Sequence, residues 1–509
     1  MSFSKEKSLC WAGICCVAAS LLCNEWSAAF LLSEDGQIDA AAKIVVLMFQ
    51  AMALLSGLLL IRFRSKIYFN LLQPDYKILE GVLVVGLLLR VAVFIALEPH
   101  NNDPHIDYID YIAQNGELPT ADKLLLSFHP PLYYVMATPI SKVGSDKAVQ
   151  FLSLLFSLVN LVLLYHLFRT TKLIKSYAAR CHGFLLAALL PQFIIFGNFI
   201  SNDSLSFVIG TLIFMLAFQY VEQPRLNKLA LLSFAVGLGL LTKGGFLGWF
   251  AAVFALIILV GLEYKFQAKG YLMAILIFLV LGVGVGSYKY VENTKEFGKP
   301  FLDNSILKQT WVQRQQPTIT GLGSLIDINI SKLVRYPYLS DYTRQSAPLL
   351  FYGTFWNSYI RESNFVKSRD YPFVYLPRLI YILAIPATLL MLIGAIKMLV
   401  NSRRLVDLLR KDRASLKEGL RESILLLFFF SNFILVLIWG VKHDAWSFFQ
   451  SRLLFISLFA IAAFLAHGYE TVILYNRNLT AFLNVSLGLL AVSSFSLLGI
   501  EIVGQFYSF

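Results

Sequence analysis

The chain has 509 residues, of which 57% are hydrophobic and 15% are charged, and its mean hydropathy is +0.67. Soluble domains carry about 25% charged residues, so this composition excludes a soluble globular protein and indicates a membrane protein. The formal net charge of +12 is explained by basic loops that face anionic lipid, and it predicts no nucleic-acid partner.

Hydrophobic segments long enough to cross a bilayer recur along the chain. A helix needs about 20 apolar residues for about 30 Å of hydrocarbon, which predicts an all-α polytopic fold with about 13 transmembrane helices. The expected spans lie at about residues 9–31, 41–62, 78–97, 149–168, 182–199, 203–221, 228–242, 244–262, 270–290, 377–400, 422–440, 452–468 and 480–503. Thr242-Lys-Gly-Gly245 divides one long apolar run into the seventh and eighth spans.

The positive-inside rule orients these spans. With the N-terminus in the cytoplasm, the basic loops after residues 62, 169, 225, 265 and 403 all lie on the cytoplasmic side. An odd number of spans then places the C-terminus outside. Two large segments, 98–148 and 291–376, become extracytoplasmic.

This topology suggests four parts of the chain. An extra N-terminal hairpin with its cytoplasmic loop would occupy residues 1–77, and a transmembrane core with the first outer loop residues 78–290. A large outer element would follow at 291–376, and the last transmembrane helices at 377–509.

The first outer loop is rich in acids, histidines and tyrosines. It reads Glu98-Pro-His-Asn-Asn-Asp-Pro-His-Ile-Asp-Tyr and later Phe128-His-Pro-Pro-Leu-Tyr-Tyr134. Such side chains directly outside a membrane span predict chemistry at the membrane surface, and they favour an enzyme that acts on a lipid-linked substrate.

The order of motifs resembles the GT-C superfamily of membrane glycosyltransferases, in its protein O-mannosyltransferase-like branch. The resemblance rests on the first outer loop, Ser201-Asn-Asp-Ser-Leu205, Leu240-Leu-Thr-Lys243 and Gln450-Ser-Arg-Leu-Leu-Phe455. It implies that a sugar moves from a polyprenyl-phosphate carrier to an acceptor on the non-cytoplasmic face, with inversion at the anomeric carbon. The acceptor class (protein, lipid or glycan) is left open.

A carboxylate is the expected general base, since it can take the acceptor's proton near the anomeric carbon. Many members of the superfamily carry an acidic pair shortly before the loop histidine, where this chain has Asn101-Asn102 followed by Asp103. We expect Asp103 to be the base, with Asp107 as the second choice. The structural alternative is a solvated loop position or a helix cap for Asp103 and an exposed helical face for Asp107.

Cations are expected to bind the donor phosphate, because charge-assisted hydrogen bonds are worth about 1.5–3 kcal/mol each. The four residues assigned to this role are Lys243, Arg452, His105 and Arg90. Snorkelling to the interface is the alternative for Lys243 and Arg452. Arg90 lies inside the third span, where a charge requires a partner.

Polar and aromatic side chains are expected to hold the sugar or the acceptor. The candidates are His129, Tyr133, Tyr134, Asn202, Asp203 and Trp356. Helix capping by Asp203 and interfacial anchoring by Trp356 are the structural alternatives. No cluster with metal-ligand spacing is present, so no metal or other cofactor is assigned.

Two other functions compete with glycosyl transfer. A secondary transporter would show inverted repeats and ionisable groups at the midplane. A polyprenyl-linked glycan ligase or polymerase would also have many spans and one large outer loop. The expected location is a bacterial inner membrane, where membrane lipids surround the chain.

Overall fold

The computed structural model describes residues 77–99, 103–302, 321–337, 341–357, 375–402, 416–443, 445–475 and 477–504, with scattered positions between 10 and 62. Every regular element in this part of the chain is helical. The predicted all-α fold is therefore confirmed. Of the first two predicted spans, 9–31 and 41–62, the structure describes only scattered positions.

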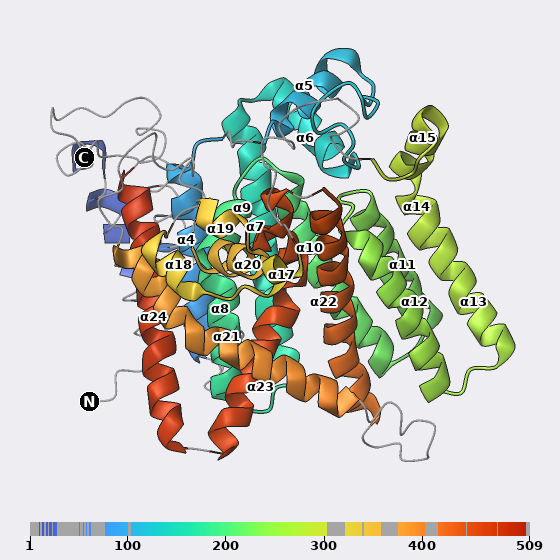
Figure 1. Cartoon of the computed structure of the whole chain (residues 1–509). Coiled ribbons are helices and arrows are strands. Elements are labelled where there is room, and N and C mark those ends of the chain that lie inside the picture. The colour runs from blue at the N-terminus through green and yellow to red at the C-terminus, as the bar shows by residue number, and fades with distance from the viewer. Residues whose placement is uncertain are drawn as a thin grey trace.

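Nine helical segments in the described part of the chain are long and apolar enough to cross a membrane. They stand side by side as a bundle (Figure 1). In chain order they comprise α4 (Lys77–Ala96), α7 (Asp146–Thr170), α10 (Asn202–Glu222), α12 (Phe246–Glu263), the run α13–η2–α14 (Ala268–Phe278, Leu279–Val283, Gly284–Gly286), α21 (Tyr375–Ser402), α22 (Leu416–His443), the run η5–η6–α23 (Trp446–Phe449, Ser451–Ser457, Leu458–Tyr475) and α24 (Arg477–Gly504).

Two further predicted spans take a different form. The segment expected as one helix over 182–199 is broken into α8 (Tyr177–Leu189) and α9 (Pro191–Phe196). Pro191 has no N–H to continue the ladder and disfavours helical backbone at the residue before it, so α8 ends there. The seventh span is the shorter α11 (Leu226–Leu240), which ends before the glycine pair at 244–245.

The first outer segment forms two short helices at one end of the bundle, α5 (His105–Asn115) and α6 (Leu132–Val143) (Figure 1). Gly116 ends α5 with φ of 72°, a left-handed conformation that glycine adopts without steric cost. α15 (Tyr288–Phe297) continues from the α13–η2–α14 run towards this end.

The second outer segment is not a simple loop. Its described part contains α17 (Leu322–Ile326), α18 (Ile330–Arg335), α19 (Asp341–Arg344) and α20 (Ala347–Trp356). Leu349 and Leu350 of α20 are fully buried. The segment is therefore a folded element that packs against the spanning helices.

Glycines allow the closest helix crossings in the bundle. A Cβ at Gly210 of α10 would lie 2.5 Å from the carbonyl oxygen of Ile456 in η6. Small residues let membrane helices approach to backbone contact. This crossing brings the start of α10 next to η6, and both elements carry residues of the site described next.

Candidate active site

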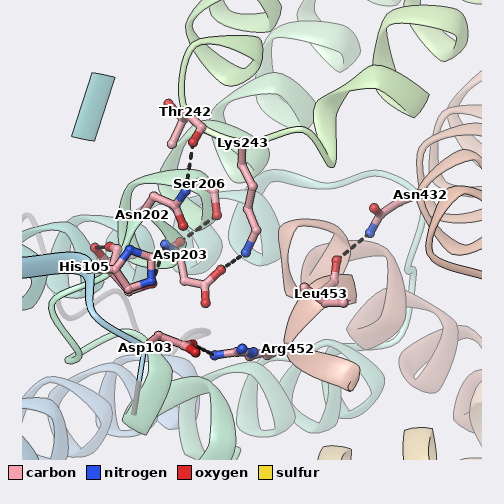
Figure 2. Close-up of polar contacts among 12 residues, drawn as sticks. Asp103, His105, Asn202, Asp203, Ser206, Thr242, Lys243, Asn432, Arg452 and Leu453 are labelled. Atoms are coloured by element: carbon pink, nitrogen blue, oxygen red, sulfur yellow. Dashed lines mark hydrogen bonds and ion pairs between the residues drawn. The ribbon is translucent and has the colours of Figure 1, made fainter. Parts of the chain in front are cut away.

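Two ion pairs lie together where α5, α10, α11 and η6 meet (Figure 2). Arg452 Nη1 donates to Asp103 Oδ2 at 2.8 Å. Lys243 Nζ donates to Asp203 Oδ1. Each pair also acts electrostatically on its neighbour, since the charge of Arg452 reaches Asp203 and the charge of Lys243 reaches His105. The four charged groups therefore form one cluster.

The start of α10 positions Asp203 and Asn202. Ser201 caps the helix, because its side chain accepts a hydrogen bond from Asp203 N at 3.0 Å. Asn202 Nδ2 donates to the carbonyl oxygen of Thr242 at 3.1 Å. Asp203 is 3% exposed, so its carboxylate depends on Lys243 for compensation of its charge.

The end of α11 positions Lys243. Carbonyls at a helix end lack intrahelical partners, and three consecutive ones at and just beyond the end of α11 accept bonds from three different elements. Tyr290 of α15 donates to Leu240 O at 3.3 Å, Leu132 N of α6 to Leu241 O at 2.9 Å, and Asn202 to Thr242 O. The backbone that carries Lys243 is therefore fixed from three sides.

The 3-10 helix η6 positions Arg452. Ser451 N donates to Thr354 Oγ1 of α20 at 2.9 Å, and Asn432 Nδ2 of α22 donates to Leu453 O at 3.0 Å (Figure 2). The guanidinium of Arg452 also lies 5.1 Å from the ring centroid of Phe196, within the range of a cation–π contact. The outer helix α20, the spanning helix α22 and α9 thus hold this arginine.

Stacked rings line the other side of the cluster. His105 stacks on Tyr134 at 5.8 Å between centroids and on His129 at 6.2 Å, and Tyr134 stacks on Tyr108 at 3.9 Å. His105 Nδ1 and Tyr134 Oη are 2.9 Å apart. Tyr133 points from the same helix to Ser153 Oγ of α7, also at 2.9 Å. Aromatic faces of this kind can stack on a sugar ring.

Burial and charge set the protonation of the cluster. Burial alone would raise the pKa of Asp103, but Arg452 and His105 lower it to about 2. Burial lowers the pKa of His105 to about 4 and that of His129 to about 3. At neutral pH the carboxylate is ionised and both imidazoles are uncharged. Burial raises the pKa of Tyr134, so its phenol keeps its proton and can donate to Nδ1 of His105.

Most of the residues expected from the sequence meet in this cluster. The residues in it or directly beside it are Asp103, His105, His129, Tyr133, Tyr134, Asn202, Asp203, Lys243 and Arg452.

Three expected site residues lie elsewhere. Asp107 is on the exposed side of α5. Arg90 is fully buried in α4, where Nη1 donates to Gly86 O at 3.0 Å and to Ala188 O at 2.9 Å. Trp356 donates to Thr388 Oγ1 at 3.0 Å and lines a mainly apolar pocket with leucines of α8 and α24.

The structure adds residues that the sequence did not single out. These residues are Phe196 and Tyr108, whose rings contact residues of the site, and Tyr290 and Asn432, which hydrogen-bond the backbone that carries them. The one sequence signal for any of these four residues was that Asn432 lies within an apolar span, because a buried asparagine needs a hydrogen-bonding partner.

Among the described residues, no group of three His, Cys, Asp or Glu side chains is arranged to hold a metal ion.

Comparison with protein families bears on this geometry. Residues 128–288 match the family model described as dolichyl-phosphate-mannose-protein mannosyltransferase. The resemblance to GT-C membrane glycosyltransferases is confirmed over these residues. The matched segment begins at residue 128, directly before His129-Pro-Pro131, and includes Asp203 and Lys243, whereas Asp103 and Arg452 lie outside it. The chain is accordingly an integral membrane protein.

Solved structures give a distant similarity. The apo oligosaccharyltransferase of Archaeoglobus fulgidus is 14% identical, with a TM-score of 0.46, over 86% of this chain and 56% of that one. The same archaeal enzyme in complex with an inhibitory peptide and a dolichol-phosphate is 14% identical, with a TM-score of 0.41, over 84% and 55%. This chain therefore spans little more than half of those structures. No curated protein matches it.

Proposed function

We propose that the chain is a GT-C glycosyltransferase that moves a sugar from a polyprenyl-phosphate carrier to an acceptor on the non-cytoplasmic face. The paired carboxylates and cations beside a stacked aromatic wall carry this proposal. The match to a family of dolichyl-phosphate-mannose users supports the lipid-phosphate donor. Dolichol-phosphate is bound in a structure of the archaeal oligosaccharyltransferase, and that observation concerns the archaeal protein.

Arg452 and Lys243 would bind the donor phosphate. Both are cations at the ends of helical elements, and their ion pairs lie close together (Figure 2). Charge-assisted bonds to phosphate would stabilise the leaving group as the C1–O bond breaks and its electron pair goes to the phosphate oxygen.

Asp103 would act as the general base. The acceptor's nucleophilic atom attacks C1 from the face opposite the phosphate, and its proton passes to the carboxylate. In the resting protein Arg452 holds the pKa of Asp103 low, which weakens it as a base. Engagement of Arg452 by the donor phosphate would relax this pairing and make the carboxylate more basic when the donor is bound.

The uncharged His105 and His129 would bind the sugar by hydrogen bonds. If Nδ1 of His105 accepts from Tyr134, Nε2 carries the ring proton and can donate. The ring column formed by Tyr108, Tyr134 and the two histidines would supply a stacking surface. The polar groups gather at helix ends rather than at the midplane, which is the arrangement expected of this chemistry and not of a transporter.

Asp103→Asn tests the reaction and the base together. We expect wild-type protein to release polyprenyl phosphate from at least one donor in a panel of sugar-phosphate lipids. Asp103→Asn should reduce that release about 100-fold or more, since a general base contributes about 10²–10⁴-fold. Asp107→Asn is the matched control, because this acid lies exposed on the same outer helix.

The control separates the possible outcomes. Near-wild-type turnover by Asp107→Asn, with donor binding retained in Asp103→Asn, would support Asp103 as the base. Full turnover by Asp103→Asn would contradict that assignment, and loss only in Asp107→Asn would transfer the role to Asp107. A wild-type protein that accepts no donor, tested with protein, lipid and glycan acceptors, would contradict the proposed function itself.

A further inference from the structure

Arg90 is a buried cation that the proposed chemistry does not use. It lies in the spanning helix α4 and is 0% exposed. Its Nε and Nη2 have no hydrogen-bond partner among the described residues. A charge at this depth is costly, so its surroundings must offer other compensation.

The compensation comes from the break between α8 and α9. Ala188 is one of the last residues of α8, whose final carbonyls lack intrahelical donors. Pro191 supplies no N–H to the carbonyls before it. Arg90 Nη1 donates to Ala188 O at 2.9 Å, and a cation at a helix C-terminus is also favoured by the helix dipole.

The guanidinium of Arg90 also lies over the ring of Phe193 in α9, with its central carbon 5.7 Å from the ring centroid. Phe193 is the centre of three packed rings. It contacts Phe455 of η6 at 5.6 Å and Phe207 of α10 at 5.0 Å, and those two rings contact each other at 6.0 Å. The three rings therefore join α9, η6 and α10.

Each of these three elements also carries a residue of the cluster. Phe455 lies three positions after Arg452, and Phe207 lies four positions after Asp203. α9 itself ends with Phe196, the ring under the Arg452 guanidinium. A shift of α9 would move Phe196 and the two neighbouring elements together.

We propose that Arg90 is a positioning residue that locks the α8–α9 break and, through Phe193, sets the placement of Arg452 and Asp203. Arg90 contacts neither donor nor acceptor. It fixes the protein framework on which the two ion pairs are held. The activity consequences of this proposal rest on the proposed function, but its structural consequence does not.

The structural test measures backbone hydrogen–deuterium exchange of the full-length protein in nanodiscs. Arg90→Met replaces the guanidinium side chain by an unbranched apolar one of similar length. It removes the bond to Ala188 O and the cation–π contact. We expect faster exchange over residues 192–201, with exchange over the middle of α12 unchanged. Leu83→Ala, a truncation of a buried residue in the same helix, is the control and should leave 192–201 unchanged.

A double-mutant cycle adds specificity. Phe193→Leu keeps apolar volume but removes the aromatic face, so it should accelerate exchange over the same residues. The double variant should be no worse than the stronger single variant, because residues in one contact are not additive. Arg90→Lys should restore part of the protection, since an ammonium still donates to Ala188 O.

Turnover supplies the second reading. Arg90→Met should lower kcat about 10- to 100-fold through misplacement of the cluster, with a smaller change in KM. In a pH profile of turnover, the acidic limb of Arg90→Met should also shift to higher pH, because a displaced Arg452 lowers the pKa of Asp103 less strongly. Unchanged exchange over 192–201 in Arg90→Met would overturn the positioning role whatever the activity, whereas altered exchange in a protein without turnover would overturn only the proposed function.

Discussion

At the scale of single residues, burial decides the charge of the two histidines. Their surroundings are poor in water and already contain two cations, Lys243 and Arg452. A further positive charge is therefore disfavoured, and both rings stay neutral well below the ordinary pKa of histidine. On the proposed function, these neutral rings would bind a sugar hydroxyl as donor or acceptor without repelling the cations expected to bind the phosphate.

This neutrality predicts a pH dependence of stability. A histidine whose folded pKa is lowered binds a proton in the unfolded chain first, so folding is favoured above about pH 6.5 and loses stability as the pH falls towards 4. We expect the unfolding temperature to fall across that window. His105→Gln should make the dependence shallower and leave the share that comes from His129.

Tyr134→Phe is the control for this measurement. It removes the bond to His105 Nδ1 but no group that titrates in this window. It should lower the unfolding temperature at all pH values and leave the slope between pH 6.5 and 4 in place. An equally steep slope in His105→Gln would show that other groups carry the effect.

At the scale of the element, the end of α11 shows what the sequence reveals and what it does not. The glycine pair after Lys243 predicts that the helix stops there, and the structure confirms the end of α11. The donors to the carbonyls at and just beyond this end come from residues 132, 202 and 290. Nothing local to α11 indicates them, because they depend on how distant helices pack.

Tyr290 provides a test of this arrangement. Tyr290→Phe removes the hydroxyl that donates to Leu240 O and leaves the ring in place. We expect a loss of donor affinity of about five- to tenfold, from the loss of one hydrogen bond worth about 1 kcal/mol and the looser placement of Lys243. The measurement is donor binding by titration in nanodiscs.

The matched control is Tyr288→Phe, two residues away on the same helix. Its hydroxyl bonds Glu292 on an exposed surface, at 3.3 Å. Donor affinity should be unchanged in this variant. Equal losses in both would point to α15 as a whole rather than to the bond at Leu240.

At the scale of the whole molecule, hydropathy predicted the spans of the described region closely. The nine candidate spans correspond to predicted ones, and α11 and the α8–α9 pair account for two more. Among the described spans, the segment 182–199 was predicted as one helix, but the structure divides it at Pro191. The site was predicted as a set of residue types, but its pairing was not, since Asp103 and Arg452 are 349 positions apart.

Orientation follows from the same pattern and can be tested directly. Lys123, between α5 and α6, is predicted outside, and Lys172, between α7 and α8, inside; both side chains are exposed. α7 separates them with 25 residues, about 37 Å of helix. Each lysine would be replaced by cysteine in a variant without the native cysteines.

An impermeant maleimide applied to intact cells should label Lys123→Cys and leave Lys172→Cys unlabelled until the cells are lysed. The cysteine-free parent controls for background. The reverse pattern would invert the topology and place the ion-pair cluster on the cytoplasmic face.

The two ion pairs have a consequence for selectivity in a bilayer full of phosphate. Each cation of the cleft already has an internal carboxylate, so an incoming anion gains only the difference between its own contacts and those it replaces. A bulk phospholipid headgroup offers little beyond the charge. On the proposed function, a lipid whose sugar also contacts the histidine and tyrosine rings would gain further contacts and could displace the carboxylates. On the proposed function, we therefore expect the two carboxylates to exclude the abundant phospholipids and to give way to a lipid that carries a sugar.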